Sequence, residues 1–507
     1  MAAQHRETPG TFEDRLQVIQ NRFRCYSPVS VLHASLEYLY EPVSGEHGRL
    51  MKHPWQTLLL LKWVFLDPLA MTPGRPAIDR VELIGILQLM YELSNKGRRP
   101  SDYEDVTLFL RAAAYQQFVH QGNEGMVDLA RQQALFAQVP ENHFFRTRFF
   151  RSTSVPVDDF LLLSLTTLAG YGADCYVMKR DHLFDLFPTK TPDVIDAFLR
   201  AVSIDVDKLP AALAELDVSG RSADEFVEPT PFMRHPLVKV GSEYWCINQQ
   251  ILQRSLGHFI YDKLKQDDND RFSSPFGSAF EKYVEQQLSD QSCLAYAAEQ
   301  DLIRHLPAGK VVDFLVVDGD ANIFIDAKGV EMSVRGRTTH RRDIVHQATK
   351  TSLIKAVEQG LDVCTRIVKH DLAHPIIRTR KTNFLLAVTY KQLYIANGRR
   401  LADAIGADRM QQIRSQYAAD DKIPDENIYF LTIGEFEVLM AMVALGRIGL
   451  AEALERAKVA DSSPHTQKFF FDQHIASWPE STLPNLIHPL DVHLGSLIEG
   501  LRTAFPG

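Results

Sequence analysis

The chain has 507 residues, which is too long for one ordinary hydrophobic core, so two or three domains are expected. A hydrophobic fraction of 45% and a charged fraction of 23% exclude a disordered or fibrous protein. The net charge of −9 argues against indiscriminate wrapping of nucleic acid, yet residues 331–400 hold 14 Lys and Arg against 5 Asp and Glu, an excess of nine positive charges that leaves −18 for the rest of the chain.

The cysteines and the N-terminus predict a cytoplasmic protein. No two cysteines have the short spacing that structural zinc or a disulfide framework needs; they are Cys25, Cys175, Cys246, Cys293 and Cys364. The first ten residues lack the basic start and apolar run of a signal peptide. The longest apolar stretch, Trp55 to Leu66, is shorter than the roughly 20 residues that cross a bilayer, so we interpret it as a buried helix and expect no membrane partner.

Residues 1–225 are expected to form a large all-α N-terminal domain. Between Thr11 and Leu216, apolar residues recur every three or four positions, as in Val81 to Met90, and no strand alternation stands out. Residues 217–236 are rich in Ser, Asp, Glu and Pro, which is typical of a surface linker and places the domain boundary there. A helical domain without chemistry of its own suggests partner sensing or substrate positioning.

Residues 226–446 are predicted to form an α/β domain with a mixed sheet, followed by a helical C-terminal extension over residues 447–507. In chain order we expect a hairpin (237–240 and 244–247), a helix, a polar break at 266–274 and a helix at 277–288. Strands follow at 311–317 and 322–327, joined by the turn signal Asp318-Gly319-Asp320. A basic loop at 331–342, a helix from Asp343 to Gly360 and strands at 383–389 and 428–432 complete the pattern.

Charged residues interrupt two of these apolar strands. Asp313 lies within the run from Val311 to Val317, and Asp326 lies in the next strand, two positions before Lys328. Burying a carboxylate is expensive unless a cation meets it. Because strand side chains alternate, Asp326 and Lys328 project from the same face, and a hairpin turning near Gly319 brings Asp313 opposite them. Two carboxylates and a carbonyl form a hard-oxygen site suited to Mg²⁺ or Mn²⁺.

This arrangement resembles the PD-(D/E)XK nuclease superfamily. The resemblance is carried by Glu281 on a helix, then Asp313, then Asp326-Ala327-Lys328 at a strand end, although Val312 replaces the proline of the family motif. It covers roughly a third of the chain. It implies an αβββαβ core, with the first strand within residues 294–303, and hydrolysis of phosphodiester bonds.

The resemblance also implies a set of functional residues. Gln347, on the helix after the lysine strand, resembles the supporting glutamine of exonuclease-like branches. The metal ligands would be Asp313, Asp326 and Glu281. The expected catalytic residues are Glu281, Asp313, Asp326, Lys328 and Gln347.

Simpler interpretations compete with this one. A D/E-x-K tripeptide arises by chance about three times in such a chain. The prediction therefore depends on the apolar strands, the Asp-Gly turn and the preceding helix around the tripeptide. Asp326 and Lys328 would alternatively form a solvated ion pair on an edge strand. Ser278-Ala279-Phe280-Glu281 also has the pattern of a helix capping box, which would give Glu281 a structural role.

Basic residues near the predicted site are candidates for nucleic-acid binding, with a solvated charge run as the alternative. The candidates are Arg335, Arg337, Arg341, Arg342 and Lys350. Residues 378–381 form a second basic cluster. Residues 143–151 interleave phenylalanine with arginine, which is typical of single-strand binding but more often of a helix that buries its aromatic rings.

The sequence therefore predicts a metal-dependent nuclease that acts on DNA or on structured RNA such as transfer RNA. The alternative is an inactive nuclease fold that serves as a nucleic-acid or protein interaction module. A nuclease of this superfamily with an appended helical domain is similar to regulated effectors of bacterial anti-phage defence, in which a protein trigger such as a phage component would act through the helical domain. The sequence leaves a homodimer open.

Overall fold

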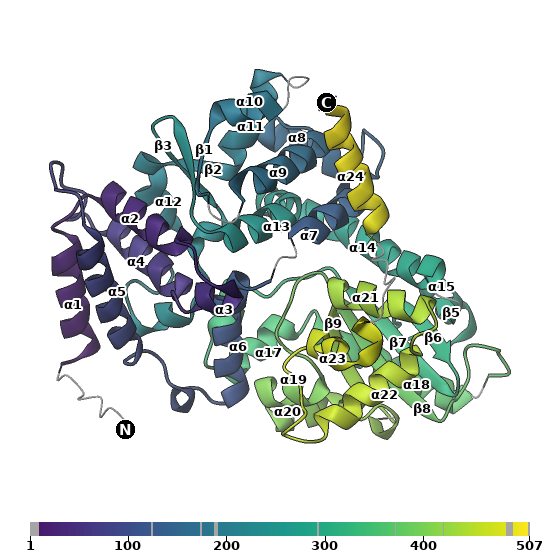
Figure 1. Cartoon of the computed structure of the whole chain (residues 1–507). Helices are drawn as coiled ribbons and strands as arrows, with labels where there is room; N and C mark the ends of the chain where they lie inside the picture. The colour runs from purple at the N-terminus through teal and green to yellow at the C-terminus, as the bar shows by residue number, and fades with distance from the viewer. Residues whose placement is uncertain are drawn as a thin grey trace. The chain divides into compact units, whose positions relative to one another are not determined.

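The computed structural model describes residues 10–122, 125–172, 175–186, 191–291, 294–370, 372–418, 420–482 and 490–504. The chain folds into two compact units (Figure 1). Unit 1 comprises residues 1–99, 113–267 and 493–507, and unit 2 comprises residues 100–112 and 268–492. In the part of the chain that is described, no helix is long and apolar enough to cross a membrane.

Unit 1 is mostly helical, and one of its apolar cores is formed largely by its N-terminal helices. Buried side chains of α1, α2, α4, α5 and α12 meet those of the strands β3 and β4 in this core. The helix α4, which spans the apolar stretch noted in the sequence, is buried along almost its whole length. The helices are α1 Phe12–Phe23, α2 Pro28–Tyr40, α3 Gly45–Leu50, α4 Pro54–Leu66, α5 Arg80–Ser94, α6 Val106–Gln117, α7 Gly125–Gln132, α8 Phe144–Thr153, α9 Val157–Tyr171, α10 Arg180–Leu186, α11 Pro192–Val202, α12 Leu209–Leu216, α13 Gln249–Asp267 and, at its C-terminal end, α24 Asp491–Ala504.

Unit 1 also contains a four-stranded sheet, so the prediction of an all-α N-terminal domain is wrong. The strands β1 Val177–Lys179, β2 Ser203–Asp205, β3 Leu237–Val240 and β4 Glu243–Cys246 lie in the order β1-β4-β3-β2. The strands β3 and β4 form the predicted hairpin. The sequence did not reveal β1 and β2 because three residues are too few to show strand alternation. The hairpin and α13, which the sequence placed with the later domain, belong to unit 1.

Two predicted breaks are in fact structured. The expected surface linker 217–236 contains two short 3-10 helices, Ala223–Val227 and Pro231–Met233, which bury Glu225, Phe226 and Phe232. The polar break predicted at 266–274 shrinks to one residue, because α13 ends at Asp267 and α14 begins at Asn269. Residues 266–274 looked like a loop because most of the polar side chains at the start of α14 are exposed to solvent.

Unit 2 is built around a five-stranded mixed sheet in the order β5-β6-β7-β8-β9 (Figure 1). The strands β5 Ala295–Ala298, β6 Phe314–Asp318 and β7 Ala321–Lys328 are antiparallel neighbours, and β8 Thr382–Thr389 and β9 Ile428–Thr432 continue parallel to β7. A tight turn with Gly319 at a φ of 57° joins β6 to β7. The mixed sheet was predicted, but the helix Glu299–His305 between β5 and β6 was not.

Helices of unit 2 pack on this sheet. The helix α14 lies against β7 and α21, and α18 lies against β7 and β8. The helices are α14 Asn269–Gln291, α15 Glu299–His305, α16 Val334–Thr338, α17 Arg342–Thr349, α18 Leu353–His370, α19 Gly398–Ile405, α20 Ala407–Arg414, α21 Ile433–Ala444, α22 Leu450–Asp461 and α23 Phe471–Ser477.

The single helix predicted from Asp343 to Gly360 is wrong, because α17 and α18 are separate. Gly360 lies inside α18 rather than at its end. A Cβ atom on Gly360 would come within 2.9 Å of Leu385 Cδ1, so this glycine lets α18 pack closely on β8. Leu385 is in register with Phe324, and Phe324 projects from the same face of β7 as Asp326 and Lys328. The helix α18 therefore covers the face that carries the charged pair.

Candidate active site

Asp326 and Lys328 are buried at the C-terminal end of β7. The carboxylate of Asp326 is 0% exposed, and the Lys328 Nζ atom lies 2.5 Å from its Oδ2 atom. The strand β7 is flanked by β6 and β8, so the alternative of a solvated ion pair on an edge strand is wrong. Neither oxygen of Asp326 makes a hydrogen bond of normal geometry with a described residue. The Lys328 ammonium is the cation that pairs with this carboxylate.

Asp313 lies opposite Asp326 across the hairpin. Phe314 is in register with Ile325, so the residue before β6 faces Asp326. The backbone N–H of Ala327 donates to Asp313 Oδ2 at 2.6 Å, which fixes the side chain. Burial and the neighbouring Asp326 raise the pKa of Asp313, and burial raises the pKa of Asp326 despite the opposing effect of Lys328. The two carboxyl groups are close enough to share a hydrogen bond.

The helix α18 anchors both sides of this arrangement through Gln359. The Lys328 ammonium donates to Gln359 Oε1 at 3.0 Å, and Gln359 Nε2 donates to the carbonyl of Val311. One amide therefore links the lysine to the segment that leads into Asp313. Gln347, the predicted supporting glutamine, is instead exposed on α17. The break between α17 and α18 changes which residues face the sheet. Gln359 therefore contacts Lys328, and Gln347, for which a supporting role was predicted, does not face the site.

Glu281 reaches the same region from α14. Gly329, directly after β7, allows this approach, since a Cβ atom there would come within 2.9 Å of the Phe276 ring. The capping-box interpretation of Glu281 is wrong, because α14 begins at Asn269 and Glu281 lies in its interior. Partial burial, together with Glu299, Glu285 and Asp326, raises the pKa of Glu281.

The charges at the site suit a divalent cation. Asp313, Asp326 and Glu281 contribute three carboxylates against one buried lysine, and burial raises the pKa of each of these carboxyl groups. The unpartnered oxygens of Asp326 are the hard donors that Mg²⁺ and Mn²⁺ prefer. Among the described side chains, no three His, Cys, Asp or Glu converge closely enough to surround an ion. The carboxylate oxygens of Asp313 and Asp326 are of the donor type that such a metal prefers.

The predicted nucleic-acid-binding residues fall into two groups. Arg335 and Lys350 are exposed. Arg341 pairs with Asp343 at 2.8 Å, and Arg337 donates to the carbonyl of Met332 at 2.9 Å. Arg337 and Arg341 belong to the second group, whose side chains bind partners within the protein.

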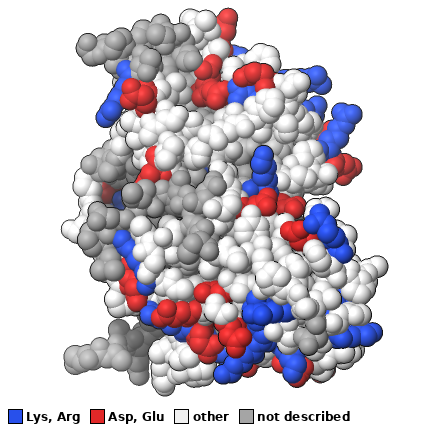
Figure 2. All heavy atoms as spheres, turned by 90° about the vertical axis from the view of Figure 1, so that its right-hand side faces the viewer, with Lys and Arg blue, Asp and Glu red and all other residues white. Residues whose placement is uncertain are grey.

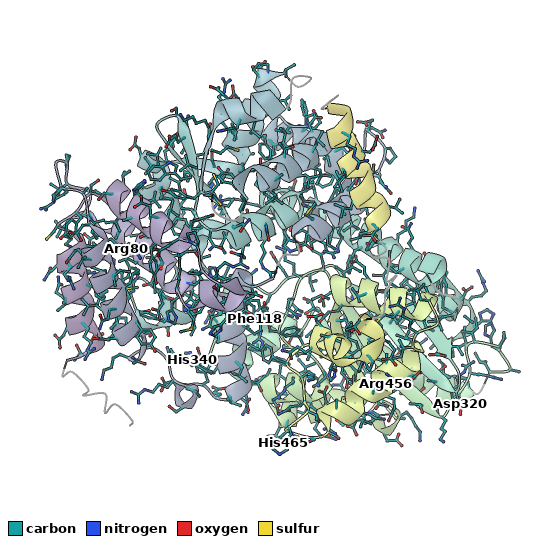
Figure 3. The ribbon with its side chains drawn as sticks, in the orientation of Figure 1. Arg80, Phe118, Asp320, His340, Arg456 and His465 are labelled. Carbon is teal, nitrogen blue, oxygen red and sulfur yellow. The ribbon has the colours of Figure 1, made fainter. Side chains whose placement is uncertain are left out.

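Arg342 belongs to that second group. Its guanidinium group pairs with Asp105 at 2.8 Å and its backbone N–H donates to Glu104, so residues of the 100–112 segment hold the end of the basic loop. Figure 3 labels His340 in this loop and Asp320 at the β6–β7 turn, and the two lie on opposite sides of unit 2 in that view. The loop is thus remote from the turn end of the hairpin.

Each of the other two basic segments contains residues with a structural role, while Arg378 and Lys381 are exposed. Arg380 is buried and donates to Asn322 Oδ1 and to the carbonyl groups of Ile376 and Pro375. Phe145 and Phe149 of α8 are buried, as expected of a helix that buries its aromatic rings. Figure 2 shows acidic and basic side chains interspersed on one face of the molecule rather than a continuous basic field.

Sequence reasoning missed Gln359, Glu285, Glu299 and Lys355. Glu285 and Glu299 act on Glu281, and the charge of Lys355 acts on Asp326. Spacing carries a signal for two of the four, since Lys355 and Gln359 lie four positions apart and share a helix face. Comparisons with protein-family models, curated proteins and solved structures found no match to this chain.

Proposed function

We propose that unit 2 is a metal-dependent nuclease that hydrolyses phosphodiester bonds of DNA or structured RNA. The observation that carries the proposal is the pair of neighbouring buried carboxyl groups of Asp313 and Asp326, with the Lys328 ammonium 2.5 Å from Asp326 Oδ2. Burying two neighbouring carboxyl groups beside one cation destabilises the fold, so a chemical role is the better explanation. The antiparallel β6–β7 hairpin and its position in a mixed sheet support the resemblance to the PD-(D/E)XK superfamily.

Each residue has a defined part in this proposal. Asp313 and Asp326 would hold Mg²⁺ or Mn²⁺ with help from Glu281, and the bound ion would polarise a phosphoryl oxygen and lower the pKa of a water molecule. Lys328 carries the positive charge that stabilises the anion developing on phosphorus. Gln359 holds the Lys328 ammonium in position through its 3.0 Å contact. These roles require no other cofactor.

Cleavage assays with matched variants test the proposal. The wild-type protein is incubated with plasmid, linear DNA, total RNA and transfer RNA, in Mg²⁺ or in EDTA. We expect Asp326→Asn and Lys328→Met to lose at least about 100-fold in cleavage rate, because each removes a charge at the reacting centre. Asp320→Asn is the control, since Asp320 is an exposed aspartate at the turn of the same hairpin. EDTA should abolish cleavage by the wild-type protein and by the control.

Two results would contradict the proposal. Cleavage by Asp326→Asn at the wild-type rate would remove the site from the reaction. Binding of nucleic acid in EDTA by a protein that never cleaves, with or without Mg²⁺, would favour the interaction-module alternative. The four substrates in the assay also separate DNA from RNA as the preferred target.

A further inference from the structure

A second lysine faces the candidate site from α18. Lys355 is exposed and lies one helical turn before Gln359, whose side chain contacts Lys328. Residues four positions apart on a helix are neighbours on its surface, and α18 packs against β7. Lys355 is therefore placed at the solvent edge of the face that carries Asp326 and Lys328.

The geometry of α18 puts Lys355 on the same side of the helix as Gln359, next to Lys328. The positive charge of Lys355 favours the ionised form of Asp326 and so opposes the effect of burial on the pKa of that residue. The neighbouring Glu358 pairs with Lys310 at 2.6 Å rather than with Lys355. Lys355 makes no ion pair or side-chain hydrogen bond within the part of the chain described, so its ammonium group is available to a ligand.

Charge balance explains why the site needs this group. Three carboxylates and Lys328 carry −2, a divalent cation would bring the site to zero, and a phosphodiester adds a negative charge that increases as the reaction proceeds. Lys328 is buried and already engaged by Asp326 and Gln359. A cation that faces solvent can meet an approaching phosphate before the phosphate reaches Lys328.

We propose that Lys355 binds a non-bridging oxygen of the substrate phosphate and positions it beside Lys328. This inference rests on the proposed nuclease function and assigns a further substrate-binding residue to it. The ligand class is an anionic phosphodiester of DNA or RNA. Contact with the backbone rather than with a base makes the effect independent of sequence.

Three variants test this role through cleavage and salt dependence. Lys355→Ala should lower the cleavage rate by 10-fold to 100-fold, and Lys355→Arg should recover part of it because the charge is restored. Lys369→Ala is the control, since Lys369 is exposed in the last turn of the same helix. Binding of nucleic acid in EDTA should lose about one unit of its salt slope in Lys355→Ala, as expected for one phosphate contact.

Metal titration separates the failure of this inference from the failure of the nuclease proposal. Loss of the Lys355 charge removes repulsion on a bound cation, so Lys355→Ala should bind Mg²⁺ at least about threefold more tightly than the wild-type protein. Thermal shift measures this affinity, and Lys369→Ala should bind Mg²⁺ as the wild-type protein does. Tighter Mg²⁺ binding and a smaller salt slope without cleavage by any form would support the placement of Lys355 and overturn the nuclease proposal. Wild-type cleavage with equal rates, salt slopes and Mg²⁺ affinities in all variants would overturn the inference alone.

Discussion

Each unit of this protein buries a lysine among carboxylates, and the two clusters differ in how completely they are satisfied. In unit 1, Lys62 on α4 pairs with Asp217 at 2.8 Å and with Glu225, and Glu228 lies 3.9 Å away. In unit 2, Lys328 lies among Asp326, Asp313 and Glu281. Both clusters contain three carboxylates and one buried amine.

The difference lies in the hydrogen bonds of the central carboxylate. In unit 1, Glu225 accepts from Lys62 through one oxygen and from Trp63 Nε1 through the other, at 2.7 Å. Burial alone would lower the pKa of Lys62, but Glu225 and Asp217 outweigh it and the pKa is raised. In unit 2, Asp326 has Lys328 Nζ 2.5 Å from its Oδ2 atom, but no described N–H group donates to its Oδ1 atom, and a second carboxyl group, Asp313, lies beside it. Burial raises the pKa of both carboxyl groups. A satisfied cluster stabilises a fold, and an unsatisfied one is suited to binding a cation.

The largest expected effect comes from breaking the satisfied cluster. Lys62→Met removes the cation and leaves Glu225 buried at 2% exposure with only Trp63 as a donor. Stranding a buried charge costs about 3–5 kcal/mol, so the free energy of unfolding of unit 1 should fall by that amount. Hydrogen exchange of peptides from α4 measures it directly.

An exposed lysine provides the control for that measurement. Lys208 pairs with Asp205 at 3.1 Å, but its side chain is 75% exposed. Lys208→Met should therefore change stability by less than about 0.5 kcal/mol. Equal effects of Lys62→Met and Lys208→Met would show that the Lys62 cluster does not stabilise unit 1.

The two clusters were not equally visible in the sequence. Asp313, Asp326 and Lys328 stood out because charges interrupted short apolar strands, and the hairpin turn fixed their register. Lys62 and Glu225 are 163 positions apart, and nothing local predicts that a polar segment folds back to bury a glutamate against a helix. Contacts made only by the tertiary fold leave no periodic signal.

The same limit explains the errors around the candidate site. Two sheet strands were predicted closely, since β9 matches its predicted residues and β8 begins one residue earlier than expected. The strand predicted at 311–317 begins only at Phe314, so Asp313 precedes β6 and does not lie within it. Gln347 was predicted from its place on the helix after the lysine strand, and Gln359 was missed. The interruption between Thr349 and Leu353 resets the helical phase. Helix existence follows from periodicity, but helix ends and the face that points inward depend on packing.

Mg²⁺ should distinguish the Asp326 cluster of unit 2 from the Glu225 cluster of unit 1. An ion that binds only the folded protein stabilises it, by about 2.7 kcal/mol at one hundred times its dissociation constant. We expect Mg²⁺ to raise the melting temperature of unit 2 in the wild-type protein, EDTA to reverse this, and Asp326→Asn to abolish it. Glu225→Gln, in the satisfied cluster, should leave the Mg²⁺-induced shift intact. A shift that survives in Asp326→Asn would assign the ion to another site.

The smallest expected effect is a gain in stability, and its pH dependence has a defined sign. Because the folded pKa values of Asp313 and Asp326 are raised, the folded protein holds more protons than the unfolded chain above about pH 4, and metal-free stability falls as the pH increases beyond that value. Asp326→Asn removes one of these carboxylates while Asp313 still balances Lys328, so unit 2 should gain about 1–2 kcal/mol in EDTA at pH 7.5.

That gain should disappear as the pH approaches 4. Asp313 and Asp326 are then protonated in the folded wild-type protein, as Asp313 is in Asp326→Asn, so neither protein buries a carboxylate at this site. Denaturant titrations of the wild-type and Asp326→Asn proteins in EDTA at pH 4, 6 and 7.5 measure the difference, and Asp320→Asn again serves as the exposed control. A loss of stability in Asp326→Asn at pH 7.5 would mean that the Asp326–Lys328 pair stabilises the fold in the same way as the Lys62 cluster. The contrast between the two clusters would then no longer support a chemical role for Asp326.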